Sequence, residues 1–470
     1  MNKYKKLFKN IGLLTIGNFA SKFLVFLLLP LYTNILTTKE YGIADLIFTT
    51  VSLLYPICSL LMSEAVMRFA LDNKNNKQVF SNAIYMTALG TTIFLLLSPI
   101  FLLFDDLKNY YVFFVVYYIF DVFNLILLQF AKGINQIKKY VVAGILSTII
   151  TISCNIVLLV ILKMGLSGYL ISYISGQLAS LLYISFSCKI WKYLLPIRKI
   201  DTKYTKKMCL FALPMIPNSI SWWISNSSDK YMLTYFTNLS IVGIYSVSYK
   251  IPSIITIISN IFMGAWQISA VENFGSKESK IFYSKIYNNY LALLSILISI
   301  IIIIIQPLAR ALFAKDFYIA WQCSGILLIA TMYNSLAAFL GSIYTSSKKT
   351  GFLFYSTLTG AIINILLNLI LIPIIGAIGA AIATLTSYLI VWLLRLLNSK
   401  RILDIKINNK KIVIITIILI TQITVQLYNV PFYYLINIIL LAFLILLNKK
   451  ILLTLLKTSA KLGRAKTKKA

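Results

Sequence analysis

The residues best placed to do chemistry in this 470-residue sequence are charged side chains inside long apolar segments. Lys22 and Lys250 lie near the middle of two such segments, and Asp121 lies near the middle of a third. A charge at the centre of a membrane-spanning helix costs roughly 2.5–3.5 kcal/mol on insertion scales, so it usually faces a partner or a cavity. Two deep lysines therefore predict a cationic cavity for an anionic substrate group. Structural pairing of Lys22 with Asp121 is the alternative.

Three further charges lie at the outer ends of predicted spans. Asp45 is just inside the outer end of the second span, and the adjacent Asp229 and Lys230 are in the outer half of the seventh. Lys230 is a further candidate for substrate binding, and both aspartates are candidate charge partners. Pairing of Lys250 with Asp229 is the structural alternative here.

Glu64 and Arg68 are four residues apart at the cytoplasmic end of the second predicted span. Residues at this spacing are neighbours on one helix face, and opposite charges there attract each other. The spacing predicts a helix-stabilising or gating ion pair. Contact between Arg68 and the substrate is the alternative.

The sequence lacks the usual groups of covalent catalysis. It has no histidine, which excludes a Ser-His-Asp triad and His-ligated zinc. The five cysteines are scattered and form no CxxC motif, so neither a disulfide framework nor a metal site is indicated. We therefore expect no enzymatic activity, no metal and no cofactor.

The elements that must position these charges are membrane helices. Hydrophobic residues make up 59% of the chain and charged residues only 12%, unlike a soluble domain. Apolar blocks of about 20 residues predict an all-α polytopic membrane protein with about fourteen spans. The predicted spans are 11–36, 42–66, 81–104, 110–131, 140–162, 166–188, 210–237, 239–264, 284–306, 318–344, 351–373, 376–397, 411–428 and 430–447.

The basic residues predict the orientation of these spans. With the N-terminus inside, 36 of the 44 Lys and Arg residues fall in inside segments and five in outside loops. This asymmetry predicts that both termini are cytoplasmic. The net charge of +31 is spread between apolar blocks, which argues against nucleic-acid binding and indicates anionic membrane lipids as partners, above all for the C-terminal tail.

The sequence contains a weak internal duplication. A shift of 201 residues aligns Tyr41-Gly42-Ile43 with Val242-Gly243-Ile244, and a shift of 211 aligns Gly165–Gly168 with Gly376–Gly379. Both repeats enter from the same side, which predicts two parallel, pseudo-symmetric six-helix lobes with a transport cavity between them. The expected segments are an N-terminal lobe (1–190), a basic connector (191–209), a C-terminal lobe (210–400), two extra helices (401–448) and a basic tail (449–470).

Several motifs resemble a known family. The run Leu36–Ile43 (LTTKEYGI) is similar to the opening of bacterial polysaccharide-repeat flippases. Ser228–Leu233 (SDKYML), followed by Val242–Ser246 (VGIYS), resembles their seventh-to-eighth helix signature. Gly376–Thr384 (GAIGAAIAT) is similar to their twelfth helix. The sequence is thus identified as a member of the polysaccharide branch of the multidrug/oligosaccharidyl-lipid/polysaccharide exporter superfamily, which includes Wzx-type flippases of O-antigen and capsule units.

This resemblance implies a function. Family members move an undecaprenyl-diphosphate-linked oligosaccharide from the inner to the outer leaflet of the bacterial cytoplasmic membrane, and the polysaccharide polymerase machinery is a further partner. Lys22 and Lys250 are the expected diphosphate contacts, and Asp45 and Asp229 are candidates for proton or sodium coupling.

Three other functions compete with this one. A lipid II flippase and a drug/cation antiporter belong to the same superfamily, although an antiporter would favour an acidic cavity. A membrane polymerase or acyltransferase is disfavoured because every outside loop is short.

Overall fold

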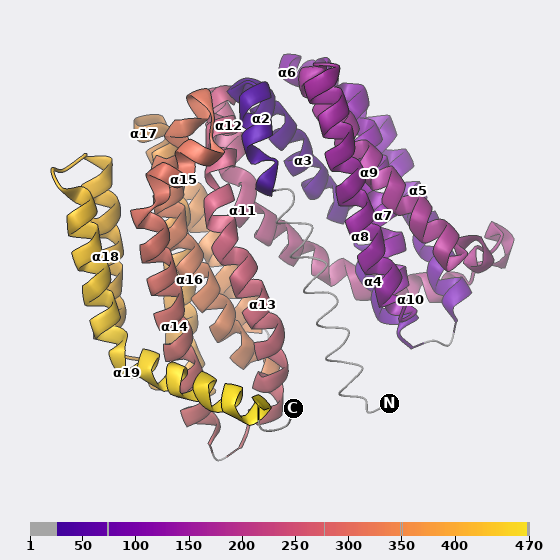
Figure 1. Cartoon of the computed structure of the whole chain (residues 1–470). Helices are drawn as coiled ribbons and strands as arrows, with labels where there is room; N and C mark the ends of the chain where they lie inside the picture. Colours follow the sequence, from indigo (N-terminus) through magenta and orange to yellow (C-terminus); the bar gives the residue numbers. More distant parts are fainter. Residues whose placement is uncertain (1–25, 73–74, 277, 348, 350, 468–470) are drawn as a thin grey trace. The chain divides into compact units, whose positions relative to one another are not determined.

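The fold is described from a computed structural model, which covers the chain except residues 1–25, 73–74, 277, 348, 350 and 468–470 (Figure 1). All regular structure in the described residues is helical. Ten helical stretches among them are long and apolar enough to cross a membrane, which makes the chain a multi-pass membrane protein. A shorter apolar stretch, Tyr433–Lys449, follows them. The total of fourteen spans stays a prediction.

The chain forms two compact units. The first extends to Ser246 and also includes Leu312–Phe317, and the second comprises Val247–Ala311 and Tyr318 onward. The domain boundaries expected from the repeat stay a prediction.

The longer helices of the first unit pack around a shared apolar core. The side chains of Met62, Ala65 and Phe130 are fully buried in it. The α-helices that begin in this unit are α2 (Leu29–Ile35), α3 (Thr38–Cys58), α4 (Met62–Ala70), α5 (Asn76–Leu97), α6 (Asp105–Lys108), α7 (Tyr111–Gly133), α8 (Ile137–Asn155), α9 (Gly165–Cys188), α10 (Thr202–Ala212), α11 (Ile216–Phe236) and α12 (Leu239–Ser248).

One predicted span of this unit is broken. Residues 42–66 were expected to form a single helix, but α3 ends at Cys58 and α4 begins at Met62. Leu60 and Leu61 adopt left-handed conformations between them, with φ of 51° and 50°. Left-handed backbone cannot continue a right-handed helix, so the chain changes direction here.

The second unit is built around a central helix, α16. In the most apolar 18-residue stretch of the segment Lys315–Ser346, which contains this helix, 83% of the residues are buried. Its helices are α13 (Lys250–Asn273), α14 (Ser279–Ile303), α15 (Ile305–Leu312), α16 (Ala320–Ser346), α17 (Gly351–Ser399), α18 (Asn409–Leu427) and α19 (Tyr433–Thr467). The 49-residue α17 kinks at Ile375 and Gly376, where the φ of Gly376 is +55°. The kink divides it where the predicted spans 351–373 and 376–397 meet.

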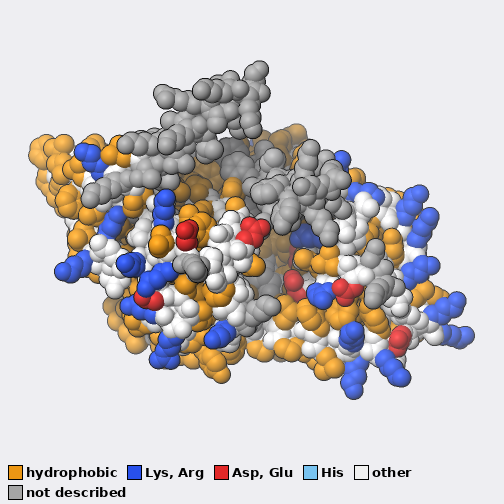
Figure 2. Space-filling view, turned by 90° about the horizontal axis from the view of Figure 1, so that it is seen from below, with side chains coloured by type: hydrophobic (Ala, Val, Ile, Leu, Met, Phe, Trp, Pro, Cys, Tyr) orange, Lys and Arg blue, Asp and Glu red, His pale blue; other side chains and the backbone are white. Residues whose placement is uncertain are grey.

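Lys and Arg side chains gather on the face shown in Figure 2, with few Asp and Glu side chains among them. The cytoplasmic orientation expected from the count of basic residues stays a prediction.

Candidate functional site: a half-buried ion pair where three helices meet

The start of α3 is fixed by a capping box. The Thr37 backbone N–H donates to the Glu40 carboxylate (2.8 Å), and the Glu40 backbone N–H donates to Thr37 Oγ1 (3.2 Å). These two bonds satisfy amide groups that a helix N-terminus otherwise leaves without partners. Asn238 caps α12 in a similar way by accepting from the Ile241 N–H (3.1 Å). Positions 37 and 238 are 201 residues apart, the shift of the internal repeat.

Two glycines allow α3 and α12 to touch through their backbones. A Cβ added to Gly42 would lie 2.2 Å from the Leu239 carbonyl oxygen, and one added to Gly243 would lie 2.0 Å from the Thr38 carbonyl oxygen. No side chain fits in either place, so the repeated Gly42 and Gly243 are required by the close approach of the helices. The two copies of the repeated motif, one at Gly42 in α3 and one at Gly243 in α12, are therefore in direct contact.

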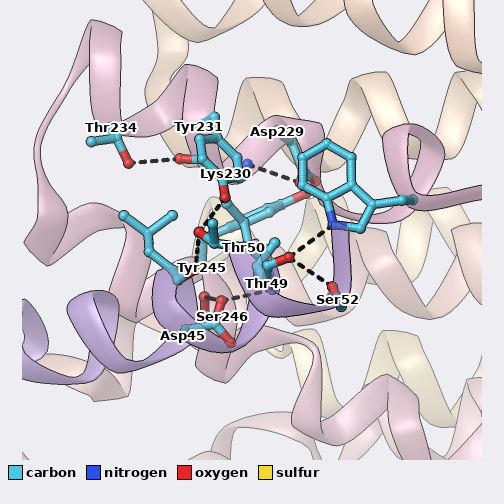
Figure 3. Close-up of polar contacts among 12 residues, drawn as sticks. Asp45, Thr49, Thr50, Ser52, Asp229, Lys230, Tyr231, Thr234, Tyr245 and Ser246 are labelled. Carbon is cyan, nitrogen blue, oxygen red and sulfur yellow. Dashed lines mark hydrogen bonds and ion pairs between the residues drawn. The ribbon is translucent and has the colours of Figure 1, made fainter. Parts of the chain in front are cut away.

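One turn beyond each glycine lies a polar side chain, and the two are hydrogen-bonded. Ser246 Oγ donates to Asp45 Oδ2 (2.7 Å), as Figure 3 shows. The same carboxylate oxygen forms an ion pair with Lys230 Nζ of α11 at 2.7 Å. Lys230 Nζ also lies 3.4 Å from Thr49 Oγ1, one turn after Asp45 on α3. Three helices are thus joined at one carboxylate.

The ion pair is half-enclosed. The side chains of Lys230 and Asp45 are 14% and 21% exposed. Trp223 donates its indole N–H to the Thr49 carbonyl (3.0 Å). The Tyr231 hydroxyl forms a 2.5 Å hydrogen bond with Thr50 Oγ1 (Figure 3). Charges that are partly removed from water attract each other more strongly, because the effective dielectric constant falls.

A second carboxylate lies beside this pair. Asp229, next to Lys230 on α11, is only 1% exposed. Its Oδ2 accepts a hydrogen bond from the Tyr245 hydroxyl of α12 at 2.6 Å. The sequence alternative paired Asp229 with Lys250, whereas the ion pair seen here joins its neighbour Lys230 to Asp45. The site can hold or exchange charge.

The other predicted lysines have separate positions. Lys22 lies outside the described residues. Lys250 begins α13 directly after a break at Tyr249, inside the candidate span Leu239–Asn273. Pro252 lacks the N–H that would bond the Ser248 carbonyl, and Ser324 Oγ of α16 donates to that carbonyl instead (2.8 Å). Within the described chain, Lys250 has no ion-pair partner.

Asp121 belongs to a polar network between α7 and α9. Gln177 donates its amide to Asp121 Oδ1 (2.9 Å) and accepts from Asn124 (2.5 Å). Asn124 in turn accepts from Ser180 (2.9 Å). In the described residues, the Asp121 carboxylate therefore accepts a hydrogen bond from a neutral amide.

Arg68 does not pair with Glu64, which corrects the expectation from their spacing. Arg68 Nη1 forms its ion pair with Asp72 Oδ1 at 2.9 Å, one turn in the other direction. Both side chains of that pair are more than half exposed. Asp72 lies just past the end of α4, so Arg68 keeps more water there than it would beside Glu64 in the first turn of the helix.

Comparisons with known proteins agree with this architecture. A family model described as "Polysaccharide biosynthesis protein" matches residues 7–267, more than half of the chain. The chain belongs to this family. The match contains both glycines of the helix crossing and both residues of the half-buried ion pair, and it confirms the family expected from the motifs.

This family member shares its fold with solved transporters. The lipid II flippase MurJ in its inward closed conformation has a TM-score of 0.71 and 16% identity, covering 94% of this chain and 98% of that one. An inward-facing multidrug resistance MATE transporter of the MOP superfamily has a TM-score of 0.68 and 13% identity, covering 81% and 94%. An uncharacterized membrane protein of Methanocaldococcus jannaschii is 26% identical over 247 residues, and this match spans 47% of each protein.

Sequence reasoning missed a buried arginine in this family member. Arg395 of α17, near the end of the predicted span 376–397, is only 4% exposed. Its guanidinium donates to Ser356 Oγ, the Ala337 carbonyl and Thr357 Oγ1, each at 3.0 Å. No carboxylate in the described residues pairs with it. The only available signal was the continuation of apolar residues on both sides of position 395.

A second missed feature is a buried amide cluster in α17. Asn368 donates to Asn364 Oδ1 (3.0 Å), and Asn364 lies 3.5 Å from Thr384 Oγ1 across the kink of the helix. All three side chains are at most 1% exposed. The four-residue spacing of two asparagines in an apolar span could have indicated this cluster.

Proposed function

We propose that this protein is a flippase that carries undecaprenyl-diphosphate-linked oligosaccharide units across the bacterial cytoplasmic membrane by alternating access. The observation that carries the proposal is membership of the polysaccharide biosynthesis family, combined with a fold shared with a lipid II flippase. The product would be an O-antigen, a capsule, lipopolysaccharide or another surface polysaccharide, assembled with a polymerase.

The half-buried ion pair suits a gate in such a cycle. Asp45 lies in α3 and Lys230 in α11, so movement of these two helices apart would break their 2.7 Å contact. Protonation of Asp45, or sodium bound near it, would weaken the pair and couple opening to an ion. An anionic substrate group could then replace the carboxylate as the partner of Lys230.

Lys250 remains the proposed diphosphate contact in the described residues, with Lys22 as its counterpart. An ammonium group in a partly dehydrated span, without a carboxylate partner in the described chain, gains strongly from a dense anion. Arg68, with its exposed partner Asp72, is better suited to the membrane surface than to the substrate. Both termini would lie in the cytoplasm, and a reporter fused within 189–205 should therefore give a cytoplasmic signal.

Complementation tests the proposal. Lys250→Ala should reach the membrane at wild-type level yet fail to restore polysaccharide export in a deletion strain, where lipid-linked intermediates accumulate in the inner leaflet. Lys163→Ala, at an exposed lysine between α8 and α9, is the matched control and should complement fully. Full complementation by Lys250→Ala would remove this lysine from the mechanism.

A lipid II flippase is the second candidate, because the shared fold covers 98% of the lipid II flippase. The two are separated by the nature of the accumulated lipid. A drug/cation antiporter is the third, since a multidrug transporter shares the fold. Changed drug resistance with normal polysaccharide in the deletion strain would favour it.

A further inference from the structure

We propose that a groove between α8 and α9 binds one anionic phospholipid of the leaflet nearest Lys139. The groove measures about 630 Å³ and is almost wholly apolar. Leu146 and Ile150 line it on α8, and Ala179 and Phe186 line it on α9. This site is independent of the proposed function, because a chain that transports nothing would still present it.

The groove is long enough for much of one lipid chain. Its lining on α9 runs from Ala179 to Ser187, eight residues further along the helix. At 1.5 Å per residue this is about 12 Å. Half of a hydrocarbon core of about 30 Å is close to the same depth, so an acyl chain in one leaflet would fill the groove.

One end of the groove carries a cation. Lys139 Nζ donates to the carbonyl of Ser187, a groove residue, at 2.7 Å. The side chain is only half-buried, and no carboxylate in the described residues pairs with it. A lysine has three N–H donors, so its ammonium group can also hold a phosphate oxygen.

A tryptophan marks the same end as the membrane surface. Trp191 is 54% exposed, and its ring meets that of Phe186 edge to face at 5.9 Å. Exposed tryptophans are enriched at the level of lipid headgroups. The cation therefore lies where a headgroup would be, and the apolar groove lies where the chain would be.

The surrounding sequence favours an anionic headgroup. Residues 122–200 contain eight Lys and Arg residues and no Asp or Glu. A zwitterionic headgroup would bring its own cation into this positive field, whereas phosphatidylglycerol brings none. This difference is the reason for choosing an anionic phospholipid as the occupant.

Native mass spectrometry of the purified full chain tests the site. Phosphatidylglycerol or phosphatidylcholine with the same acyl chains is added, and lipid-bound fractions are compared. The wild type should prefer phosphatidylglycerol. Lys139→Gln should weaken its binding about fivefold, the effect of one basic residue near an anionic surface. Lys163→Gln, an exposed lysine beyond the far end of α8, is the matched control and should change nothing.

A second variant tests the groove itself. Ala179→Phe should reduce binding of phosphatidylglycerol with little change in thermal unfolding, and Lys139→Arg should retain it. Equal binding by Lys139→Gln and Lys163→Gln, or no preference for phosphatidylglycerol, would reduce the bound lipid to a non-specific annular contact and overturn the proposal. Displacement of phosphatidylglycerol by undecaprenyl diphosphate would also overturn it, since the groove would then belong to the substrate.

Discussion

The half-buried ion pair between Asp45 and Lys230 should contribute measurably to stability. At 2.7 Å and an effective dielectric constant of 20, the attraction of the two charges is about 6 kcal/mol before desolvation. Removing one partner of a fully buried pair costs about 3–5 kcal/mol, because a charge is left without compensation. Since both side chains here are partly exposed, we expect about 2–3 kcal/mol for either Asp45→Asn or Lys230→Gln.

A double-mutant cycle isolates the pair. The single variants and the double variant are unfolded in detergent by a denaturant titration, and the coupling energy is the deviation from additivity. We expect a coupling of about 2 kcal/mol, with the double variant less destabilised than the sum of the singles. Asparagine retains an oxygen for the Ser246 hydroxyl, so the cycle reports the charge and not that hydrogen bond.

The chain provides a matched control. Lys39 and Asp106 also form a Lys–Asp ion pair, at 3.1 Å, but their side chains are 59% and 49% exposed. The cycle for this pair should give at most about 1 kcal/mol, as for other exposed pairs. A coupling below about 0.5 kcal/mol for Asp45 and Lys230, or one equal to that of the control pair, would refute the reasoning from burial.

Three further substitutions test the packing. Gly42→Ala should destabilise the chain by more than about 1 kcal/mol, because its Cβ would meet a backbone carbonyl at 2.2 Å. The control Gly264→Ala, with nothing within 4 Å of the added Cβ, should stabilise the chain by up to about 1 kcal/mol. Equal effects of the two variants on thermal unfolding would contradict the close helix crossing. Ser324→Ala should cost about 1–2 kcal/mol of stability in a denaturant titration, because the Ser248 carbonyl loses its donor. Adding Pro252→Ala to this variant should restore most of that stability by supplying the missing N–H, and failure of the rescue would show that the lost hydrogen bond is not the cause. Arg395→Lys should lower the denaturant midpoint of unfolding, since one ammonium group cannot reach the three acceptors that surround the planar guanidinium. An unchanged midpoint would show that these buried hydrogen bonds are dispensable for stability.

Much of the fold follows from apolar segment length. Blocks of about 20 apolar residues predict the spanning helices, and the Gly376 kink lies at the junction of two predicted spans because proline and glycine interrupt the pattern there. The break at Leu60 and Leu61 could not be predicted. Leucine rarely adopts left-handed backbone, so tertiary packing and not local preference imposes this conformation.

The candidate site was predicted in part. Asp229 and Lys230 were expected inside the seventh predicted span, and both lie in helix α11. Their partners could not be deduced from the sequence. Asp45 comes close to Ser246 because α3 and α12 cross at Gly42 and Gly243, and this crossing is a tertiary contact that the sequence pattern does not reveal.

Arg395 illustrates a different limit. A hydropathy pattern assigns an arginine near the end of a span to the adjacent connector. It carries no information about hydrogen-bond acceptors that distant parts of the chain bring to the side chain. The hydroxyls of Ser356 and Thr357, 39 and 38 residues earlier in α17, and the Ala337 carbonyl of α16 compensate this cation. Charge counting therefore does not predict the environment of any one basic residue.

Transport itself is the most direct test of the account. The purified chain is reconstituted into liposomes that contain undecaprenyl-diphosphate oligosaccharide, and the fraction accessible to a sugar-modifying reagent outside is followed over time. We predict that the protein moves this lipid between leaflets without changing its mass, and that Lys250→Ala slows the movement while Lys163→Ala does not. A covalently altered product, or a rate equal to that of protein-free liposomes under every imposed proton and sodium gradient, would contradict the proposed flippase function.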